Sequence, residues 1–140
     1  MNKLYLALLF IIISSLEGKT QNLEGLYNCA YSKQMGNWLI SENSELEIKR
    51  DKNKILIYKV KRTIIDEYNN NVPSTTTFSG IIKRTTLKSS GVEAWLFVGG
   101  DYGKHGAYFV TTESKVKSIR VWIPAIGYGK EQSRDYIKNQ

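Results

Sequence analysis

The sequence predicts an all-β protein: a single antiparallel up-and-down barrel of about eight strands, with a β-sandwich as the alternative. Apolar residues recur at every second position over most of the chain after residue 20. Short polar or glycine-containing segments separate these stretches, as turns between strands do. Residues 21–125 contain no stretch with the apolar spacing of a helix. Many short strands joined in order by tight turns are typical of a barrel or a sandwich.

The chain begins with a segment typical of a secretory signal peptide. A basic start at Lys3 precedes an apolar run over residues 4–13, and small and polar residues follow at 14–18. The run is too short to cross a bilayer, which takes about 20 apolar residues. We therefore expect residues 1–20 to be removed. Residues 21–140 then form one domain, secreted or periplasmic, without membrane insertion.

The first strands are predicted to be apolar on one face only. In residues 45–50, Leu46 and Ile48 share one face while Glu45 and Glu47 share the other. Polar turns at 51–54 and 69–74 separate the longer segments. The expected strands before residue 66 are residues 26–31, 38–41, 45–50 and 55–65, and residues 75–87 are the expected return strand of the following hairpin.

The later strands are predicted to be apolar on both faces. They cover residues 92–98, 107–112 and 117–123. Because an antiparallel sheet normally exposes one face to water, this pattern requires a second cover. We expect residues 126–140 to supply it, with a ligand or protein contact as the alternative. Residues 130–139 lack Gly and Pro, which predicts a short C-terminal helix or, alternatively, a frayed tail.

Charge and cysteine content narrow the class of protein. The net charge of +7 favours acidic partners such as polyanions, anionic lipids or acidic proteins. The sequence contains no basic stripe interleaved with aromatic residues, which is the pattern that would indicate nucleic-acid binding. Cys29 is the only cysteine, so an internal disulfide is impossible, and we expect a buried thiol. Its position far beyond the apolar run also excludes lipid attachment.

Catalytic chemistry has little support in the sequence. His105 is the only histidine and lies in the glycine-rich segment 99–106, which we interpret as a flexible hairpin loop. This segment lacks the spacing and the Ser or Thr of a phosphate-binding loop. One His and one Cys also cannot form the usual zinc set, so no metal or cofactor is expected. An enzyme would have to use His105 with Asp101 or Tyr102 and is the least expected class.

Two sets of residues are candidate binding groups. If the hairpin between residues 55–66 and 76–87 is centred near residue 71, Lys59 lies opposite Lys83. These lysines, with Lys61 and Arg62, would contact an anion or an acidic partner, a solvated basic face being the alternative. Aromatic residues of a barrel interior are the candidates for lining a ligand cavity; they are Tyr58, Trp95, Phe97, Tyr108 and Trp122.

Gly25, Tyr27 and Arg120 give the chain a resemblance to the calycin group, which includes lipocalins, fatty-acid-binding proteins and avidins. Those families begin with Gly-x-Trp on the first strand and often place an Arg on a late strand across from it. Tyr27 replaces that Trp here. The resemblance implies an antiparallel barrel and a small, often apolar ligand. The expected function is therefore an exported, non-catalytic binding protein for a small, partly apolar molecule; the alternative is a binding module or inhibitor of an acidic exported partner.

Overall fold

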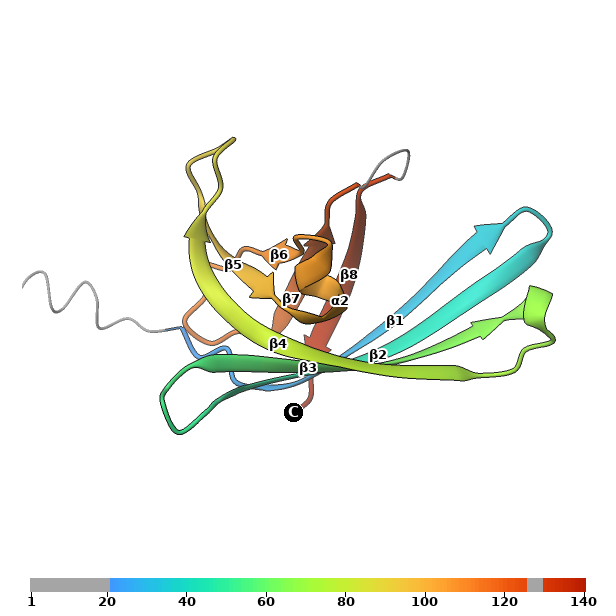
Figure 1. Cartoon of the computed structure of the whole chain (residues 1–140), viewed down its shortest axis with the longest axis horizontal. Helices are drawn as coiled ribbons and strands as arrows, with labels where there is room; N and C mark the ends of the chain where they lie inside the picture. The colour runs from blue at the N-terminus through green and yellow to red at the C-terminus, as the bar shows by residue number, and fades with distance from the viewer. Residues whose placement is uncertain (1–20, 126–129) are drawn as a thin grey trace, which may run out of the picture.

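The computed structural model describes residues 21–125 and 130–140, which form a closed eight-stranded antiparallel barrel (Figure 1). Each strand pairs with the next in sequence, and the last returns to the first. The predicted fold class is therefore confirmed. The predicted signal peptide, residues 1–20, lies outside the described residues.

The strands differ greatly in length. The first four have 11 to 13 residues and the last four have 2 to 7. Neither described helix is long and apolar enough to span a membrane. In chain order the elements are β1 (Gly25–Met35), β2 (Trp38–Arg50), β3 (Leu56–Asp66), η1 (Glu67–Asn69), β4 (Ser74–Thr86), β5 (Glu93–Val98), α2 (Gly100–Lys104), β6 (Tyr108–Phe109), β7 (Ser118–Ile123) and β8 (Gln132–Lys138).

Aromatic side chains fill the barrel interior. Alternate residues of each strand point inward, as predicted for β2, where Leu46 and Ile48 are buried and Glu45 is exposed. An eight-stranded barrel has an interior that side chains can fill. Here its largest fully buried side chains are those of Tyr27, Tyr58, Tyr102, Tyr136, Phe97 and Phe109.

The glycine-rich segment 99–106 is not a hairpin loop, contrary to our prediction. It contains the short helix α2, which puts the fully buried ring of Tyr102 into the barrel. Gly100 has a φ of 65°, and a Cβ there would lie 2.6 Å from the Tyr58 hydroxyl. Glycine thus permits both the backbone angle and the close approach. The Tyr58 hydroxyl donates to the Gly99 carbonyl at 2.5 Å, which holds the start of α2 against β3.

The predicted C-terminal helix is also wrong, because residues 132–138 form strand β8. This strand pairs with β7 from Ser118 to Ile123 and with β1 at Tyr27 and Asn28. Arg134 and Tyr136 point inward and are buried. The described C-terminal residues therefore close the barrel as a strand and do not cover a face of the sheet.

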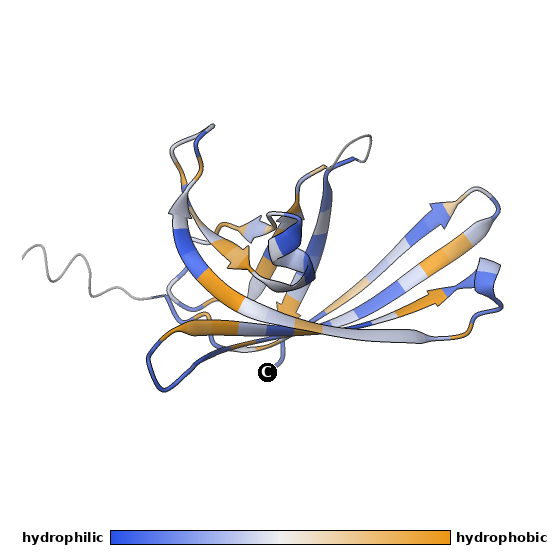
Figure 2. Cartoon of the chain, viewed as in Figure 1, coloured by the Kyte–Doolittle hydropathy of each residue, from blue (hydrophilic) through white to orange (hydrophobic). Residues whose placement is uncertain are grey.

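The hairpins β1–β2 and β3–β4 extend beyond the shorter strands (Figure 1). We call their projecting parts, residues 29–42 and 62–78, the arms. Apolar and polar bands alternate along them (Figure 2). Trp38 and the largely exposed Tyr68 pack at the tip, with ring centroids 5.2 Å apart. We call the end of the barrel from which the arms project, on the side of α2 and β8, the open end (Figure 1).

Candidate functional site

The open end of the barrel contains a recess that we call the mouth pocket. Its volume is about 260 Å³. It is lined by side chains from the arms, from α2 and from the ends of β7 and β8. The lining residues are Glu42, Arg62, Asp101, His105, Ile123, Pro124, Lys130, Gln132 and Arg134.

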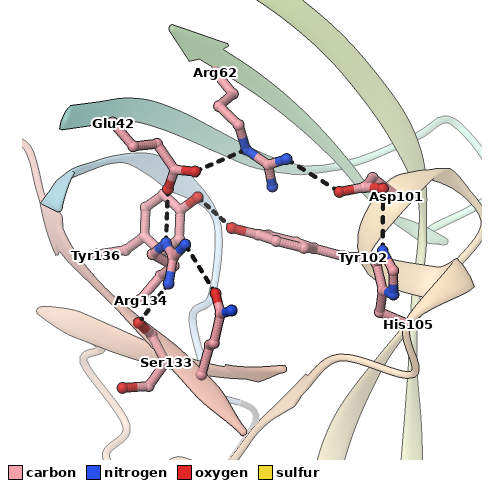
Figure 3. A network of polar contacts seen from close by, with 9 residues as sticks. Glu42, Arg62, Asp101, Tyr102, His105, Ser133, Arg134 and Tyr136 are labelled. Carbon is pink, nitrogen blue, oxygen red and sulfur yellow. Dashed lines mark hydrogen bonds and ion pairs between the residues drawn. The ribbon is translucent and has the colours of Figure 1, made fainter. Parts of the chain in front are cut away.

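A network of ion pairs forms the floor of this pocket (Figure 3). Glu42 on β2 lies between two arginines. Its Oε2 accepts a hydrogen bond from Arg134 Nε at 2.7 Å, and its Oε1 lies 3.3 Å from Arg62 Nε. The side chains of Glu42 and Arg134 are only 7% and 9% exposed. Charges buried to this extent require pairing, and each member of the network supplies it for the others.

The network continues from Arg62 to α2. Arg62 Nη1 donates to Asp101 Oδ2 at 3.1 Å, and Asp101 Oδ1 lies 3.4 Å from His105 Nε2. Burial by itself lowers the pKa of the Arg62 guanidinium, but Glu42, Tyr102 and Asp101 together outweigh it and raise that pKa. Arg62 therefore remains cationic inside the barrel.

The pocket carries more positive than negative charge. Arg62, Arg134 and Lys130 are cations, whereas Glu42 and Asp101 are the carboxylates. With His105 neutral, the lining has one positive charge in excess. Arg62 Nε is buried and has no partner with hydrogen-bonding geometry among the described residues. The arrangement is therefore suited to an anion that enters from the open end.

Two buried tyrosines separate the pocket from the apolar core. The hydroxyls of Tyr102 and Tyr136 are 2.6 Å apart. Burial raises the pKa of both side chains, so each stays protonated. Arg62 lies over the Tyr102 ring at 5.7 Å, and Arg134 lies over the Tyr31 ring at 3.6 Å. The arginines thus rest on aromatic rings, which adds cation–π attraction to the ion pairs.

The structure does not bring the five predicted ligand-lining aromatics together. Tyr58 and Phe97 pack against each other in the filled core, with centroids 4.8 Å apart. Trp95 packs at the edge of that core, and its Nε1 donates to Gln21 at 3.1 Å. Tyr108 pairs with Trp122 across β6 and β7. Both are partly exposed. Tyr108 lies between the fully buried Ala107 and Phe109, and Trp122 follows the fully buried Val121, which places both on the outer surface.

The predicted opposition of Lys59 and Lys83 is wrong. Lys59 pairs with Ser79 and Lys83 with Leu96, because the β3–β4 hairpin is centred near residue 69. Lys59 and Lys61 lie on the outer face across from glutamates of β2. Arg62 alternates with Lys61 and points inward, into the mouth pocket. The four basic residues therefore do not form one site.

Residues that carry the calycin resemblance lie apart. Tyr27 is fully buried, and its hydroxyl donates to the Leu23 carbonyl at 2.7 Å. Arg120 is exposed on β7 and pairs with Asp135 of β8, its Nε lying 2.6 Å from Asp135 Oδ1. Arg120 therefore does not lie across the barrel against Tyr27.

Sequence reasoning missed Glu42 and Arg134, the two most buried charges of the site. Had residues 132–138 been interpreted as a strand, the alternation with Tyr136 would have placed Arg134 inside. A buried Arg requires a carboxylate that also points into the barrel. Glu42 is a candidate for this carboxylate because it comes shortly after the apolar residues 38–40. The pairing itself joins positions 92 residues apart, so no local pattern indicates it.

No family model, curated protein or solved structure matches this chain. Within the described residues, no group of three or more His, Cys, Asp or Glu side chains is arranged to hold a metal ion. Burial, followed by the charge of Glu42, raises the pKa of the lone Cys29 thiol. The mouth pocket is therefore the feature from which a function is proposed below.

Proposed function

We propose that the protein is an exported, non-catalytic binding protein that holds a small, partly apolar anion at the mouth pocket. The observation that carries this proposal is the recess of about 260 Å³ with one positive charge in excess. A carboxylate, with its single negative charge, would complete the charge balance, and Arg side chains suit this group. Export is supported by the signal-peptide pattern of residues 1–20.

The surroundings of the pocket support a ligand with an apolar part. Ile123 and Pro124 belong to the lining itself. Cross-strand pairing puts Tyr31 and Ile64 on the same face as Glu42, and both are half-buried. This inner face of the arms continues from the charged floor toward the tip. An anionic head in the pocket would therefore place an apolar tail along the arms.

The filled core sets the depth at which such a ligand can bind. Tyr102 and Tyr136 lie directly beneath the charged floor, and Phe97 and Phe109 pack deeper. A ligand in the barrel centre would have to displace these rings. We therefore place the ligand at the open end, above the tyrosine pair.

The test uses decanoate as the probe and decanol as its uncharged counterpart. Isothermal titration of the mature protein is expected to show binding of decanoate and much weaker binding of decanol. Lys130→Gln removes an exposed cation of the pocket without disturbing the buried pairs, and we expect at least a tenfold weaker affinity, about 1.4 kcal/mol. Arg120→Gln removes an outer-face cation and should leave the affinity unchanged. Absence of decanoate binding, or equal losses in the two variants, would overturn the proposal.

A protein-binding module remains the second candidate, supported by one observation on the outer surface. Val110 and Ile137 are 38% and 66% exposed beside the Arg120–Asp135 ion pair. Exposed apolar side chains next to paired charges are common at protein interfaces. A photo-crosslinking amino acid placed at Ile137, but not one placed at Lys104, would then capture an acidic exported protein.

A further inference from the structure

The two strands that close the barrel, β1 and β8, share only a short stretch of backbone pairing. Strand β1 pairs with β2 along its whole length, from Gly25 to Met35. Among residues 21–125 and 130–140, it pairs with β8 only at Tyr27 and Asn28. The two strands then diverge, as Figure 1 shows. Residues 29–35 of β1 therefore form a strand edge without a ladder partner among the described residues, and we call the interval between the β1 and β8 backbones the gap; the Arg134 side chain enters it over Tyr31.

The direction of the backbone groups on this edge follows from one hydrogen bond. The Asn139 N–H donates to the Leu26 carbonyl at 2.8 Å, so the polar groups of Leu26 point away from β2. In an antiparallel ladder this direction alternates from residue to residue. The N–H and C=O groups of Ala30, Ser32 and Gln34 consequently point into the gap. They present the hydrogen-bonding pattern that an added strand requires.

A second free edge on β4 provides an internal comparison. The Ser79 carbonyl is directed toward Gly100, because a Cβ there would lie 2.8 Å from its oxygen. By alternation, the backbone groups of Thr75 and Thr77 also point away from β3. The hydroxyls of Thr63 and Thr75 lie 3.0 Å apart, as expected for a pair without ladder hydrogen bonds. Residues 74–82 carry no charge, so this edge offers the backbone pattern without electrostatic attraction.

The edge on β1, by contrast, has basic side chains around it. Lys33 is exposed on the edge itself, and Arg134 lies over Tyr31 at 3.6 Å. Lys130 lies beyond Arg134, toward the start of β8. Glu42 is paired with Arg134 and Asp135 with Arg120, so these charges offset each other, and Lys33 and Lys130 supply the positive charge that a partner would meet. An incoming strand with acidic side chains would meet complementary charge, whereas a second copy of this chain, with net charge +7, would meet repulsion.

We propose that the free edge of β1 binds an extended acidic peptide segment of a protein partner by strand addition. The backbone of Ala30, Ser32 and Gln34 would form the ladder. Acidic side chains on alternate positions would face Lys33 and Lys130. This inference uses backbone groups that the proposed anion site does not use, so the two proposals can fail separately.

The first experiment measures amide hydrogen exchange by NMR on the mature protein, with a blocked probe peptide of sequence Glu-Thr-Glu-Val-Glu-Thr-Glu. The amides of Ala30, Ser32 and Gln34 should exchange at least tenfold more slowly when the peptide is bound, while those of Thr75 and Thr77 should not change. The same peptide with Lys in place of Glu should have no effect. Equal protection of both edges would overturn the proposal. So would β1 edge amides that are already protected in the free protein, since part of the chain would then occupy the edge.

Matched substitutions locate the contact. Ser32→Pro removes a donor that points into the gap, and Thr77→Pro removes the equivalent donor on β4. We expect the first to weaken acidic-peptide binding at least tenfold and the second to leave it unchanged, with decanoate binding intact in both. Lys33→Glu changes only an exposed side chain and should also weaken acidic-peptide binding at least tenfold. Unchanged acidic-peptide binding in Ser32→Pro or in Lys33→Glu would refute strand addition at β1.

Discussion

The two ends of this barrel are stabilised in different ways. At the closed end, every strand has a neighbour on each side, and aromatic rings fill the interior. At the open end, β1 and β4 lose one neighbour each, and the interior contains paired charges. Apolar packing thus dominates where the sheet is continuous, while polar groups remain where it separates. The difference separates the part of the chain that packs the core from the part for which we propose binding.

The sharpest test of this comparison is a pair of tyrosine truncations. Tyr102 is fully buried, and its ring centroid lies 5.1 Å from those of Phe78 and Phe97. We expect Tyr102→Ala to lower the free energy of unfolding by about 3–5 kcal/mol, because it leaves a cavity in the aromatic core. Tyr68→Ala, at the 76% exposed arm tip, should change it by no more than about 0.5 kcal/mol. Urea denaturation followed by circular dichroism measures both, and similar losses would show that the arms contribute as much stability as the core.

A smaller loss is expected from the charged floor. Glu42→Gln keeps the shape of the side chain but leaves Arg62 and Arg134 without their shared carboxylate. Removing one partner of a buried pair costs about 3 kcal/mol. Glu45→Gln, on the exposed face of the same strand, is the control and should be close to neutral. If Glu42→Gln were neutral in urea denaturation, the network would not contribute to holding the open end together.

Alkaline pH should weaken the closed end. Burial raises the pKa of both Tyr27 and Tyr58 to about 12, from an ordinary value near 10. Below pH 10 both tyrosines are protonated in the folded and unfolded states, so their contribution is constant. Between pH 10 and 12 these two tyrosines ionise only in the unfolded chain, so the free energy of unfolding falls by roughly 2–3 kcal/mol for each tyrosine. Urea midpoints measured across this range should show a smaller fall in Tyr58→Phe; an identical fall would mean that Tyr58 does not take part.

The smallest effect is expected on the outer surface. Arg120 and Asp135 form an exposed pair, and such pairs contribute little to stability. Arg120→Gln should therefore leave the urea midpoint unchanged. The hydrogen bond from Arg120 holds the pKa of Asp135 below its ordinary value. Carboxyl ¹³C NMR should accordingly show that this pKa rises in the variant, and a shifted urea midpoint would contradict the expectation.

Sequence periodicity predicted the fold class, although it divided β2 into two strands, 38–41 and 45–50, and missed β8. Leu46 and Ile48 alternate with glutamates, and this pattern alone defines the buried face of β2. The turn residues at 51–54 separated β2 from β3 at the correct place. Because an up-and-down barrel joins strands in sequence order, correct strands and short turns already imply its topology.

Errors arose where distant residues decide the outcome. The strand 132–138 resembled a helix or a tail because Arg134 is polar and yet buried, which depends on Glu42. The helix α2 was missed because Gly99 and Gly100 suggest a loop, while the packing of Tyr102 under Arg62 stabilises a helical turn. The β3–β4 register was misplaced by a two-residue error in the hairpin centre, which moved the partner of Lys59 from Ser79 to Lys83. The prediction of the candidate site was wrong for the same three reasons, because the residues of the site lie in these segments.

Closure of the barrel has a consequence for the order of folding. The seam joins the first strand to the last, and the amide side chains of Asn28 and Asn139, 111 positions apart, meet across it. Forming such a contact costs the conformational entropy of closing nearly the whole domain into one loop, and contacts of this kind slow folding. While the chain is synthesised, β1 to β7 can pair in succession, but the ring cannot close until residue 139 has left the ribosome. Until then Tyr27, which the finished barrel buries completely, lies on a strand that has a partner, β2, on one side only.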